Sequence, residues 1–332
     1  MNIRTLPRIS LAFLPTPIQE LRALTSVLGG PSILIKRDDQ TGLALGGNKA
    51  RKLEFLIADA LEHRADTVVT LGAAQSNHCR QTAAAAARAG LRCSLILGGP
   101  EPDFPNGNLL LDHLFGATVH WSTMEGRVQR MEEVVQDLKK RGRQPYPIPY
   151  GGSNAVGATG FAVAMDELTT QLSQINRHVD AIVVASSSGG TQAGLVVGAR
   201  AAGFEGRIIG VSIDKGERGE ERYETELARL ANQIAERIGM PSDFSDGDFQ
   251  VAYDYLGGGY GVVGTLERQA IQMLARHEGV LLDPVYTGRA MGALIDMIRN
   301  RVFSSDHTVL FWHTGGAPAL FHYAGELLVD SP

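Results

Sequence analysis

The 332-residue sequence has only two cysteines, Cys79 and Cys93, and they do not form a C-x-x-C pair. This scarcity excludes a disulfide-stapled scaffold and fits a reducing compartment. No stretch approaches the roughly 20 consecutive apolar residues of a membrane span. The apolar run at residues 11–14 is too short for a secretion signal and ends at Pro15. We therefore expect a soluble cytoplasmic protein with no membrane contact.

Positive charge is not in excess either, because 31 Lys and Arg residues stand against 36 Asp and Glu residues, a formal net charge of −5. Without a broad basic field the chain is not expected to bind nucleic acid, and a small molecule is the expected partner. The motifs G-x-S-x-G and H-E-x-x-H are missing, and the nine histidines are scattered. These absences argue against a hydrolase nucleophile elbow and against a bound metal.

Glycine, in contrast, is abundant, with 39 residues where an average usage of about 7% predicts roughly 23. Glycine is favoured where the backbone turns tightly or approaches a ligand closely. Hydrophobic residues make up 44% of the chain, and the length corresponds to roughly two domains of about 150 residues each. The excess therefore directs attention to glycine clusters within a globular, ligand-binding protein.

Short β-rich runs alternate with longer helical segments, which is the pattern of βαβ units with parallel sheets. The expected strands are residues 33–36, 67–71, 94–97, 117–121, 181–185, 207–213 and 309–313. The expected helices are residues 50–64, 78–89, 128–138, 191–202, 227–238 and 288–300. Residues 142–160, rich in Pro, Tyr and Gly, fit the pattern least and are the expected crossing between domains.

Glycine and hydroxyl residues cluster after three of these strands, at residues 71–77, 185–191 and 313–316. Ligands of open α/β sheets bind beyond the carboxyl ends of the strands. We therefore expect the three clusters to form one composite site in a crevice.

Residues 186–194 read Ser-Ser-Ser-Gly-Gly-Thr-Gln-Ala-Gly between a strand and a helix. Backbone N–H groups and hydroxyls in such a segment can converge on an anion at the helix N-terminus. The segment has no P-loop lysine and does not match G-x-G-x-x-G. It therefore predicts a phosphate cup, with a capped glycine-rich turn as the alternative.

Residues 46–49 read Gly-Gly-Asn-Lys and place Lys49 at the start of an expected helix. The helix dipole disfavours a cation there, so Lys49 is either a solvated side chain or one held for chemistry with a lowered pKa. The motif alone favours the solvated side chain. Arg51 and Lys52 are expected to form ion pairs along the helix.

The sequence Gln-Ser-Asn-His at residues 75–78 lies at another strand-to-helix junction. Its hydroxyl, amide and free backbone N–H groups are suited to a carboxylate. An ordinary helix cap by Ser76 or Asn77 explains the pattern equally well.

These three motifs, together with Leu-Asp-Pro-Val-Tyr-Thr-Gly at residues 282–288, resemble the pyridoxal-phosphate enzymes of the tryptophan-synthase-β fold type. Within that type the chain is similar to the group of D-cysteine desulfhydrase and 1-aminocyclopropane-1-carboxylate deaminase, from about residue 14 to residue 328. The resemblance implies a homodimer of two-domain, three-layer αβα chains with mostly parallel sheets. The large cofactor-binding domain would comprise residues 1–47 and 161–332, and the small inserted domain residues 48–160.

The resemblance also implies roles for individual residues. Lys49 would form the Schiff base with pyridoxal 5'-phosphate, and Asn77 would bond its phenolic oxygen. The other implied cofactor contacts are Asn48 beside the cofactor, Ser188, Gly189, Gly190 and Thr191 on the phosphate, and Thr287 or Thr314 near the ring nitrogen. The implied substrate contacts are Gln75, Ser76 and Asn77, and the implied catalytic residues are Lys49, Ser76, Tyr260 and Tyr286.

The activity implied by the resemblance is β-elimination from a small amino acid, with D-cysteine giving pyruvate, sulfide and ammonia. The cyclopropane deaminases typically carry Glu and Leu where this chain has Thr287 and Thr314. A hydroxyl cannot keep the ring nitrogen protonated as a carboxylate can, which fits β-elimination better than the opening of an unactivated ring. The alternatives are the cyclopropane deaminase, an L-cysteate sulfo-lyase, and a silent homologue that only binds a ligand.

Overall fold

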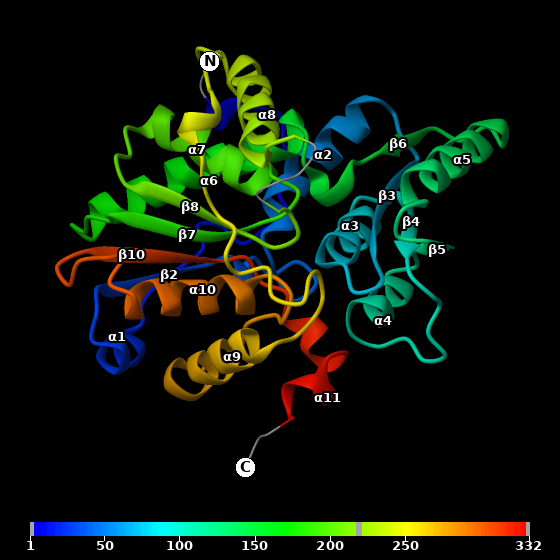
Figure 1. The fold of residues 1–332 in the computed structure, drawn as a ribbon. Coiled ribbons are helices and arrows are strands. Elements are labelled where there is room, and N and C mark those ends of the chain that lie inside the picture. The colour runs from blue at the N-terminus through cyan, green and yellow to red at the C-terminus, as the bar shows by residue number, and fades with distance from the viewer. Residues whose placement is uncertain (1–2, 217–220, 330–332) are drawn as a thin grey trace.

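The computed structural model describes residues 3–216 and 221–329. Two β-sheets lie side by side, each between layers of helices (Figure 1). The larger sheet has six strands in the order β1-β2-β10-β7-β8-β9, parallel except for the antiparallel pair β1 and β2. Its strands are β1 (Ile18–Glu20), β2 (Ser32–Arg37), β7 (Ala181–Ser186), β8 (Arg207–Ser212), β9 (Gln250–Ala252) and β10 (Thr308–His313).

The smaller sheet has four parallel strands in the order β5-β4-β3-β6. They are β3 (Thr67–Ala73), β4 (Arg92–Gly98), β5 (Thr118–Ser122) and β6 (Pro145–Pro147). All four strands fall within the predicted small domain. The division into two domains, with limits at 47/48 and 160/161, stays a prediction.

Helices cover both faces of each sheet. On the larger sheet the alternation of side chains separates two cores, with Ile182 and Val184 on one face and Ala181 and Val183 on the other. The first core includes α6 (Ala155–Gln174), α7 (Gly190–Ala202) and α8 (Tyr223–Ile238), and the second includes α1 (Arg22–Leu28), α9 (Thr265–Glu278) and α10 (Thr287–Arg299). The smaller sheet packs on α2 (Lys49–Glu62), α3 (Asn77–Arg88) and α4 (Gly107–Leu114) on one face and on α5 (Arg127–Lys140) on the other. The short α11 (Ala324–Leu327) follows near the C-terminus.

The predicted strands and helices are confirmed to within a few residues. The expected crossing at 142–160 stays a prediction, although the second half of this range is helical rather than a loop. Helix α6 begins at Ala155 and runs between the two units. A Cβ at Gly160 would lie 2.3 Å from the carbonyl oxygen of Arg51, and one at Gly194 would lie 2.4 Å from that of Ala158. Glycine therefore allows α2 and α7 to approach α6 closely. The glycine content that suggested a loop at residues 142–160 instead permits close helix packing in α6.

Cys79 and Cys93 are buried and free, as expected for a chain without disulfides. Among the described residues, no helix is both long enough and apolar enough to cross a membrane.

Candidate active site

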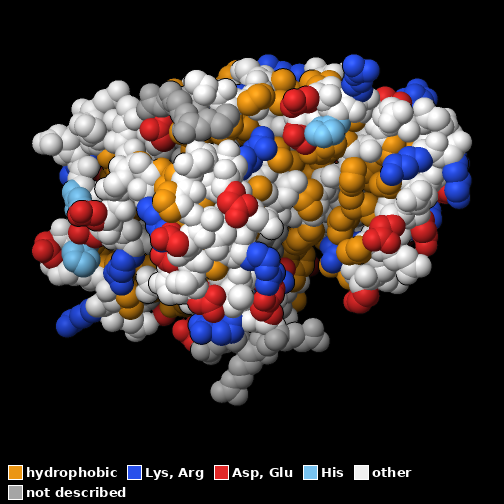
Figure 2. Space-filling model, turned by 90° about the horizontal axis from the view of Figure 1, so that it is seen from above, with side chains coloured by type: hydrophobic (Ala, Val, Ile, Leu, Met, Phe, Trp, Pro, Cys, Tyr) orange, Lys and Arg blue, Asp and Glu red, His pale blue; other side chains and the backbone are white. Residues whose placement is uncertain are grey.

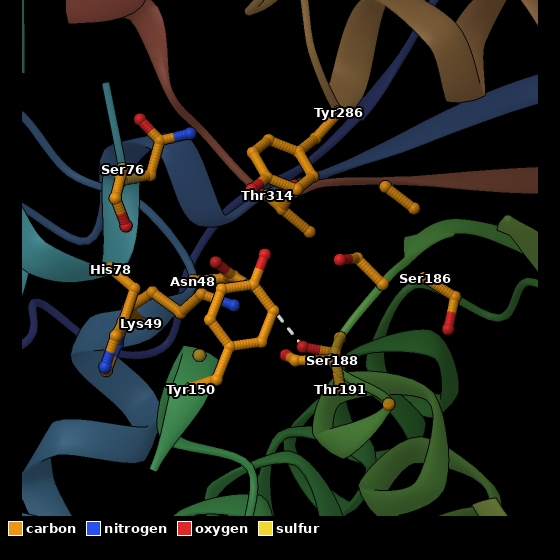
Figure 3. Close-up of a pocket in the computed structure, with 15 residues that line it drawn as sticks. Asn48, Lys49, Ser76, His78, Tyr150, Ser186, Ser188, Thr191, Tyr286 and Thr314 are labelled. Carbon is orange, nitrogen blue, oxygen red and sulfur yellow. Dashed lines mark hydrogen bonds between the residues drawn. The ribbon is translucent and has the colours of Figure 1, made fainter. Parts of the chain in front are cut away.

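The strand ends that carry the glycine and hydroxyl clusters meet at one cavity between the two units. Figure 2 shows the hollow that separates the two lobes, with hydrophobic side chains along it. Figure 3 shows labelled side chains from both units around the cavity. Its lining is formed by Asn48, Lys49, Ser76, Asn77, His78, Tyr150, Gly151, residues 185–189, Thr191, Tyr286 and Thr314. The composite site predicted from the three clusters is thus present.

Two glycines shape the backbone that leads to Lys49. Gly46 and Gly47 have φ angles of 73° and 129°, which disfavour any residue with a Cβ. A Cβ at Gly46 would lie 1.7 Å from the carbonyl oxygen of Asp39, and the Gly47 N–H donates to Thr41 Oγ1 at 2.8 Å. The turn therefore ends with Lys49 as the first residue of α2, beside the cavity.

The Lys49 amine is surrounded by protein. The side chain as a whole is half-buried, because part of it borders the cavity. Burial lowers its pKa to about 8. The neutral amine, which is the nucleophilic and basic form, is therefore accessible near physiological pH. The solvated lysine that the motif alone favoured is not what the structure shows.

The predicted phosphate cup lies at the start of α7. Gly189, with a φ of 78°, occupies the N-cap position, and the Gly190 N–H donates to Ser153 Oγ at 3.2 Å. Ser188 Oγ is 2.8 Å from Ser153 Oγ. The Asn48 amide donates to Thr191 Oγ1 at 3.1 Å, so the Lys49 turn and the cup are directly connected.

Lys52 was expected to form an ion pair, and that prediction is wrong. Its fully buried ammonium donates to Gly151 O at 3.1 Å and to Ser153 Oγ at 2.9 Å, and no carboxylate within the described ranges pairs with it. Burial, with the nearby Lys49, lowers its pKa well below the usual value. A Cβ at Gly190 would lie 2.8 Å from Lys52 Nζ. A buried lysine amine thus lies beside the cup, as its position three residues after Lys49 on one helix face could have indicated.

The loop at residues 75–77 serves both as a cap and as cavity wall. Ser76 Oγ accepts from the Cys79 N–H at 3.2 Å and caps α3, and both Ser76 and Asn77 line the cavity. The Gln75 side chain turns away, because its Oε1 and Nε2 bond the backbone of Asn108 and Asn106. Any contact of Gln75 with a substrate is therefore left to its backbone.

The two predicted tyrosines contact each other, with their hydroxyl oxygens 2.7 Å apart. Tyr286 lines the cavity, and Tyr260 borders an adjoining hollow that shares Tyr150 with it. Burial raises the pKa of both Tyr260 and Tyr286 well above the usual value, so both hydroxyls keep their protons. Tyr150 and His78 also line the cavity, and sequence reasoning missed both.

The two threonines of interest differ in position. Thr314 lines the cavity. Thr287 is fully buried, and its hydroxyl donates to Asp283 Oδ1 at 2.7 Å and accepts from the Asp283 N–H at 2.7 Å. Thr314 is therefore the better placed of the two to contact a ligand.

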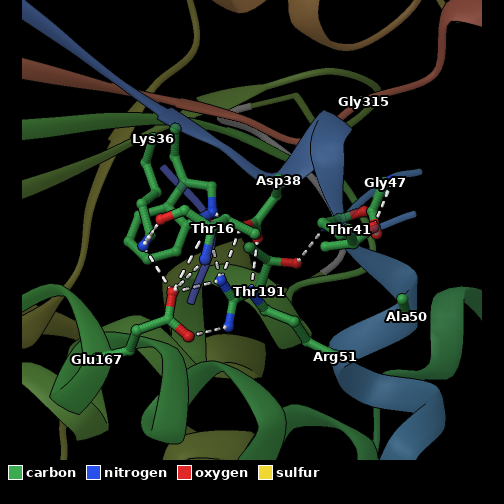
Figure 4. Close-up of polar contacts among 12 residues, drawn as sticks. Thr16, Lys36, Asp38, Thr41, Gly47, Ala50, Arg51, Glu167, Thr191 and Gly315 are labelled. Atoms are coloured by element: carbon green, nitrogen blue, oxygen red, sulfur yellow. Dashed lines mark hydrogen bonds and ion pairs between the residues drawn. The ribbon is translucent and has the colours of Figure 1, made fainter. Parts of the chain in front are cut away.

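A buried ionic network holds the Lys49 helix against the larger unit (Figure 4). Arg51 Nε is 2.9 Å from Asp38 Oδ2, and Arg51 Nη2 is 2.9 Å from Glu167 Oε1. Lys36 adds a contact of 2.6 Å to Glu167, and Trp312 Nε1 donates to Asp38 at 2.9 Å. The ion pairing expected for Arg51 is thus confirmed, with partners on other elements rather than along α2.

The family model described as "Pyridoxal-phosphate dependent enzyme" matches residues 9–315. The chain belongs to this family of enzymes. It is 42% identical to a D-cysteine desulfhydrase of Klebsiella pneumoniae (strain 342) over 98% of this chain and 99% of that protein. It is also 42% identical to a D-cysteine desulfhydrase of Salmonella typhi over 97% of this chain and 98% of that protein. A crystal structure described as the ACC deaminase homologue matches with a TM-score of 0.89 and 38% identity, covering 98% of this chain and 97% of the other.

The residues present fit the cofactor of pyridoxal-phosphate dependent enzymes. Lys49 offers an amine with a lowered pKa for the aldehyde. A dianionic phosphate suits the α7 N-terminus and the buried Lys52 ammonium, which has no carboxylate partner among residues 3–216 and 221–329. The same described residues contain no cluster of three His, Cys, Asp or Glu side chains able to hold a metal ion.

Proposed function

We propose that this pyridoxal-phosphate dependent enzyme catalyses β-elimination from a small amino acid, and that D-cysteine is the substrate. The reaction converts D-cysteine and water into pyruvate, sulfide and ammonia. The observation that carries the proposal is the Lys49 amine, with a pKa lowered to about 8, in one cavity with a phosphate cup and Ser76. The two D-cysteine desulfhydrases that match over nearly their full lengths support the choice of substrate.

Bound pyridoxal phosphate supplies an aldehyde for the Lys49 amine and a ring that spreads the charge left when the substrate loses its α-proton. Lys49, whose amine would hold the cofactor, would also be placed to remove that α-proton as a general base. The Ser76 hydroxyl and the free N–H groups at the start of α3 hold the substrate carboxylate. The Tyr286 hydroxyl, bonded to Tyr260, gives a proton to the leaving sulfur.

The remaining cofactor contacts are proposed from the same geometry. Gly189 and Gly190 would offer backbone N–H groups to the phosphate, that of Gly190 in exchange for its bond to Ser153 Oγ, with Ser188, Thr191 and Asn48 around them. The Asn77 amide donates to the phenolic oxygen. Thr314, which lines the cavity, would contact the ring nitrogen, and Thr287 would support the site through its hydrogen bond to Asp283. With a hydroxyl rather than a carboxylate at its nitrogen, the ring would be a weaker electron sink. This favours elimination of a good leaving group over ring opening.

We propose that two copies of the chain associate in the cytoplasm. Apolar side chains are exposed on α4 and on the neighbouring 3-10 helix Ala317–Phe321, where Leu114 is 70% and Phe321 73% exposed. Such adjacent apolar groups are typical of surfaces that become buried on association. Light scattering coupled to size-exclusion chromatography tests the dimer.

Product analysis tests the proposed reaction against its alternatives. The enzyme is incubated separately with D-cysteine, L-cysteine, cysteate and 1-aminocyclopropane-1-carboxylate, and sulfide, sulfite, pyruvate and 2-oxobutyrate are measured. We expect sulfide and pyruvate in equal amounts from D-cysteine. Dominant 2-oxobutyrate from the cyclopropane substrate, or sulfite from cysteate, overturns the choice of substrate, and a colourless protein inactive on all four supports the silent homologue.

The lowered pKa of Lys49 predicts how cofactor attachment depends on pH. Only the neutral amine attacks an aldehyde, so the attachment rate to cofactor-free protein should rise with pH around a midpoint of about 8. The growth of visible absorbance after mixing with pyridoxal phosphate measures this rate. Nα-acetyl-lysine in the same buffers is the control, with a midpoint near the ordinary value of about 10.4. A protein midpoint equal to that of the control contradicts a buried Lys49 amine.

Lys52→Met should weaken the binding of pyridoxal phosphate by roughly 10- to 100-fold, because a charge-assisted hydrogen bond to the phosphate contributes about 1.5–3 kcal/mol. Binding is measured by titrating cofactor-free protein. Pyridoxal, which has no phosphate, is the control ligand, and its affinity should be the same for both proteins. Equal losses for the two ligands would show that Lys52 acts on the structure of the site rather than on the phosphate.

A further inference from the structure

Asn108, in the first turn of α4, contacts the 75–77 loop although no step proposed above uses it. Its side chain is fully buried, and its Nδ2 donates to Gln75 O at 2.8 Å and to Asn77 Oδ1 at 2.8 Å. Its backbone N–H donates to Gln75 Oε1 at 2.8 Å. Three hydrogen bonds from one residue thus hold a loop 31 positions away in the sequence.

These contacts determine which end of the Asn77 amide faces the cavity. A backbone carbonyl can only accept, so the Asn108 atom bonded to Gln75 O must be its nitrogen. The same nitrogen is 2.8 Å from one end of the Asn77 amide, and that end must therefore be the oxygen. The orientation of both amides is therefore fixed by the Gln75 carbonyl oxygen, which can only accept a hydrogen bond. This removes the usual uncertainty about which end of an asparagine side chain is the nitrogen.

The Asn77 nitrogen consequently points away from Asn108. Asn77 lines the cavity, and a Cβ at Gly316 would lie 2.6 Å from Asn77 Nδ2. The nitrogen therefore lies beside the backbone that follows Thr314, on the same side of the cavity. A phenolic oxygen there receives a hydrogen bond from the Asn77 nitrogen, whereas the opposite orientation would place two acceptors against each other.

We propose that Asn108 is a positioning residue that holds the Asn77 amide with its N–H group toward the cofactor's phenolic oxygen. The inference rests on the proposed function, because the role of Asn77 belongs to it. Asn108 itself acts only through Asn77 and does not contact the cofactor.

Visible absorption of the cofactor-loaded protein, titrated with pH, tests this role without relying on turnover. An N–H group donated to the phenolic oxygen stabilises its anionic form, which lowers the pH at which the absorption changes. Asn108→Asp places an acceptor opposite Asn77, so the amide turns and presents its oxygen to the cavity. We expect the midpoint to rise by roughly one to two pH units, the equivalent of one hydrogen bond to a charged group.

Two further variants keep the test independent of folding. Asn108→Ala removes the donor without burying a charge, and we expect a smaller rise in the same direction. Asn106→Asp, at the N-cap position of α4, makes the same chemical change at a side chain that, among the described residues, bonds the exposed His322 alone. Its midpoint should equal that of the unmodified protein, and circular dichroism verifies that all variants are folded.

Asn77→Ala separates failure of this inference from failure of the proposed function. If Asn77→Ala leaves the midpoint unchanged in loaded protein, the assigned role of Asn77 is wrong and the inference falls with it. If Asn77→Ala raises the midpoint but both Asn108 variants do not, the inference alone is overturned. Asn108→Ala should add nothing in the Asn77→Ala background, because the two residues act as one unit, and an additional shift there contradicts an action through Asn77.

Discussion

Lys49→Ala is expected to reduce the formation of pyruvate from D-cysteine by at least about 10⁴-fold. The variant loses the amine proposed to attach the cofactor and to remove the α-proton as a general base, and general-base catalysis alone contributes typically 10²–10⁴-fold. The phosphate cup and Lys52 do not depend on Lys49, so the variant should still bind the cofactor weakly. Pyruvate formation measures the first effect, and retention of the cofactor through dialysis measures the second.

Lys139→Ala is the matched control, because Lys139 is an exposed lysine in the last turn of α5. Its activity and cofactor content should equal those of the unmodified enzyme. Substantial activity in Lys49→Ala would refute the assignment of Lys49, whereas loss of activity in both variants would point to an effect on the whole protein.

Much of the fold was predictable because its elements follow local rules. Strands such as β7 and β10 are short β-rich runs with helices between them, which indicates parallel sheets. Helix α6 was missed because its glycines and small residues suit close packing against α2 and α7 rather than an amphipathic pattern. Such packing is decided by neighbours distant in the sequence, and periodicity does not report on them.

The candidate site likewise contains residues that local pattern identifies and residues that depend on distant contacts. Lys49, Ser188 and Thr191 lie in glycine-rich junctions that local pattern identifies. Lys52 and Asn108 contact groups far along the chain, at Ser153 and Asn77. Charge or residue type alone therefore assigned Lys52 to an ion pair that is not found within residues 3–216 and 221–329, and gave no reason to consider Asn108.

The network around Arg51 combines local sequence with distant contacts. The helix that carries Lys49 is local in sequence, but its position is fixed by contacts with distant elements. Arg51 is only two residues after Lys49, and its partners Asp38 and Glu167 lie on the β2–α2 connection and on α6. Asp38 is fully buried and Glu167 is 13% exposed at its side chain. The folded state therefore needs the Arg51 guanidinium, because a buried carboxylate that loses its cationic partner destabilises the protein.

Arg51→Met should therefore lower the free energy of unfolding by roughly 3–5 kcal/mol, the usual effect of removing one partner of a buried ion pair. Urea unfolding of cofactor-free protein measures this change. Arg130→Met is the matched control, because Arg130 pairs with Glu133 on the surface of α5, and its effect should stay below about 1 kcal/mol. Adding Asp38→Asn to Arg51→Met should recover part of the loss, because it removes a carboxylate left unpaired.

The pH dependence of the same variant identifies the electrostatic origin of the effect. Burial disfavours the charged form of Glu167, but Arg51 and Lys36 outweigh it and lower its pKa from 4.5 to about 2. A carboxyl whose pKa is lower in the folded than in the unfolded state stabilises the folded state at pH values above its unfolded-state pKa. This contribution is lost as the pH falls through its folded-state pKa. The difference between the unmodified protein and Arg51→Met should thus be largest near neutral pH and shrink between about pH 4.5 and 2. A difference that does not change with pH would assign the loss to packing of the Arg51 side chain.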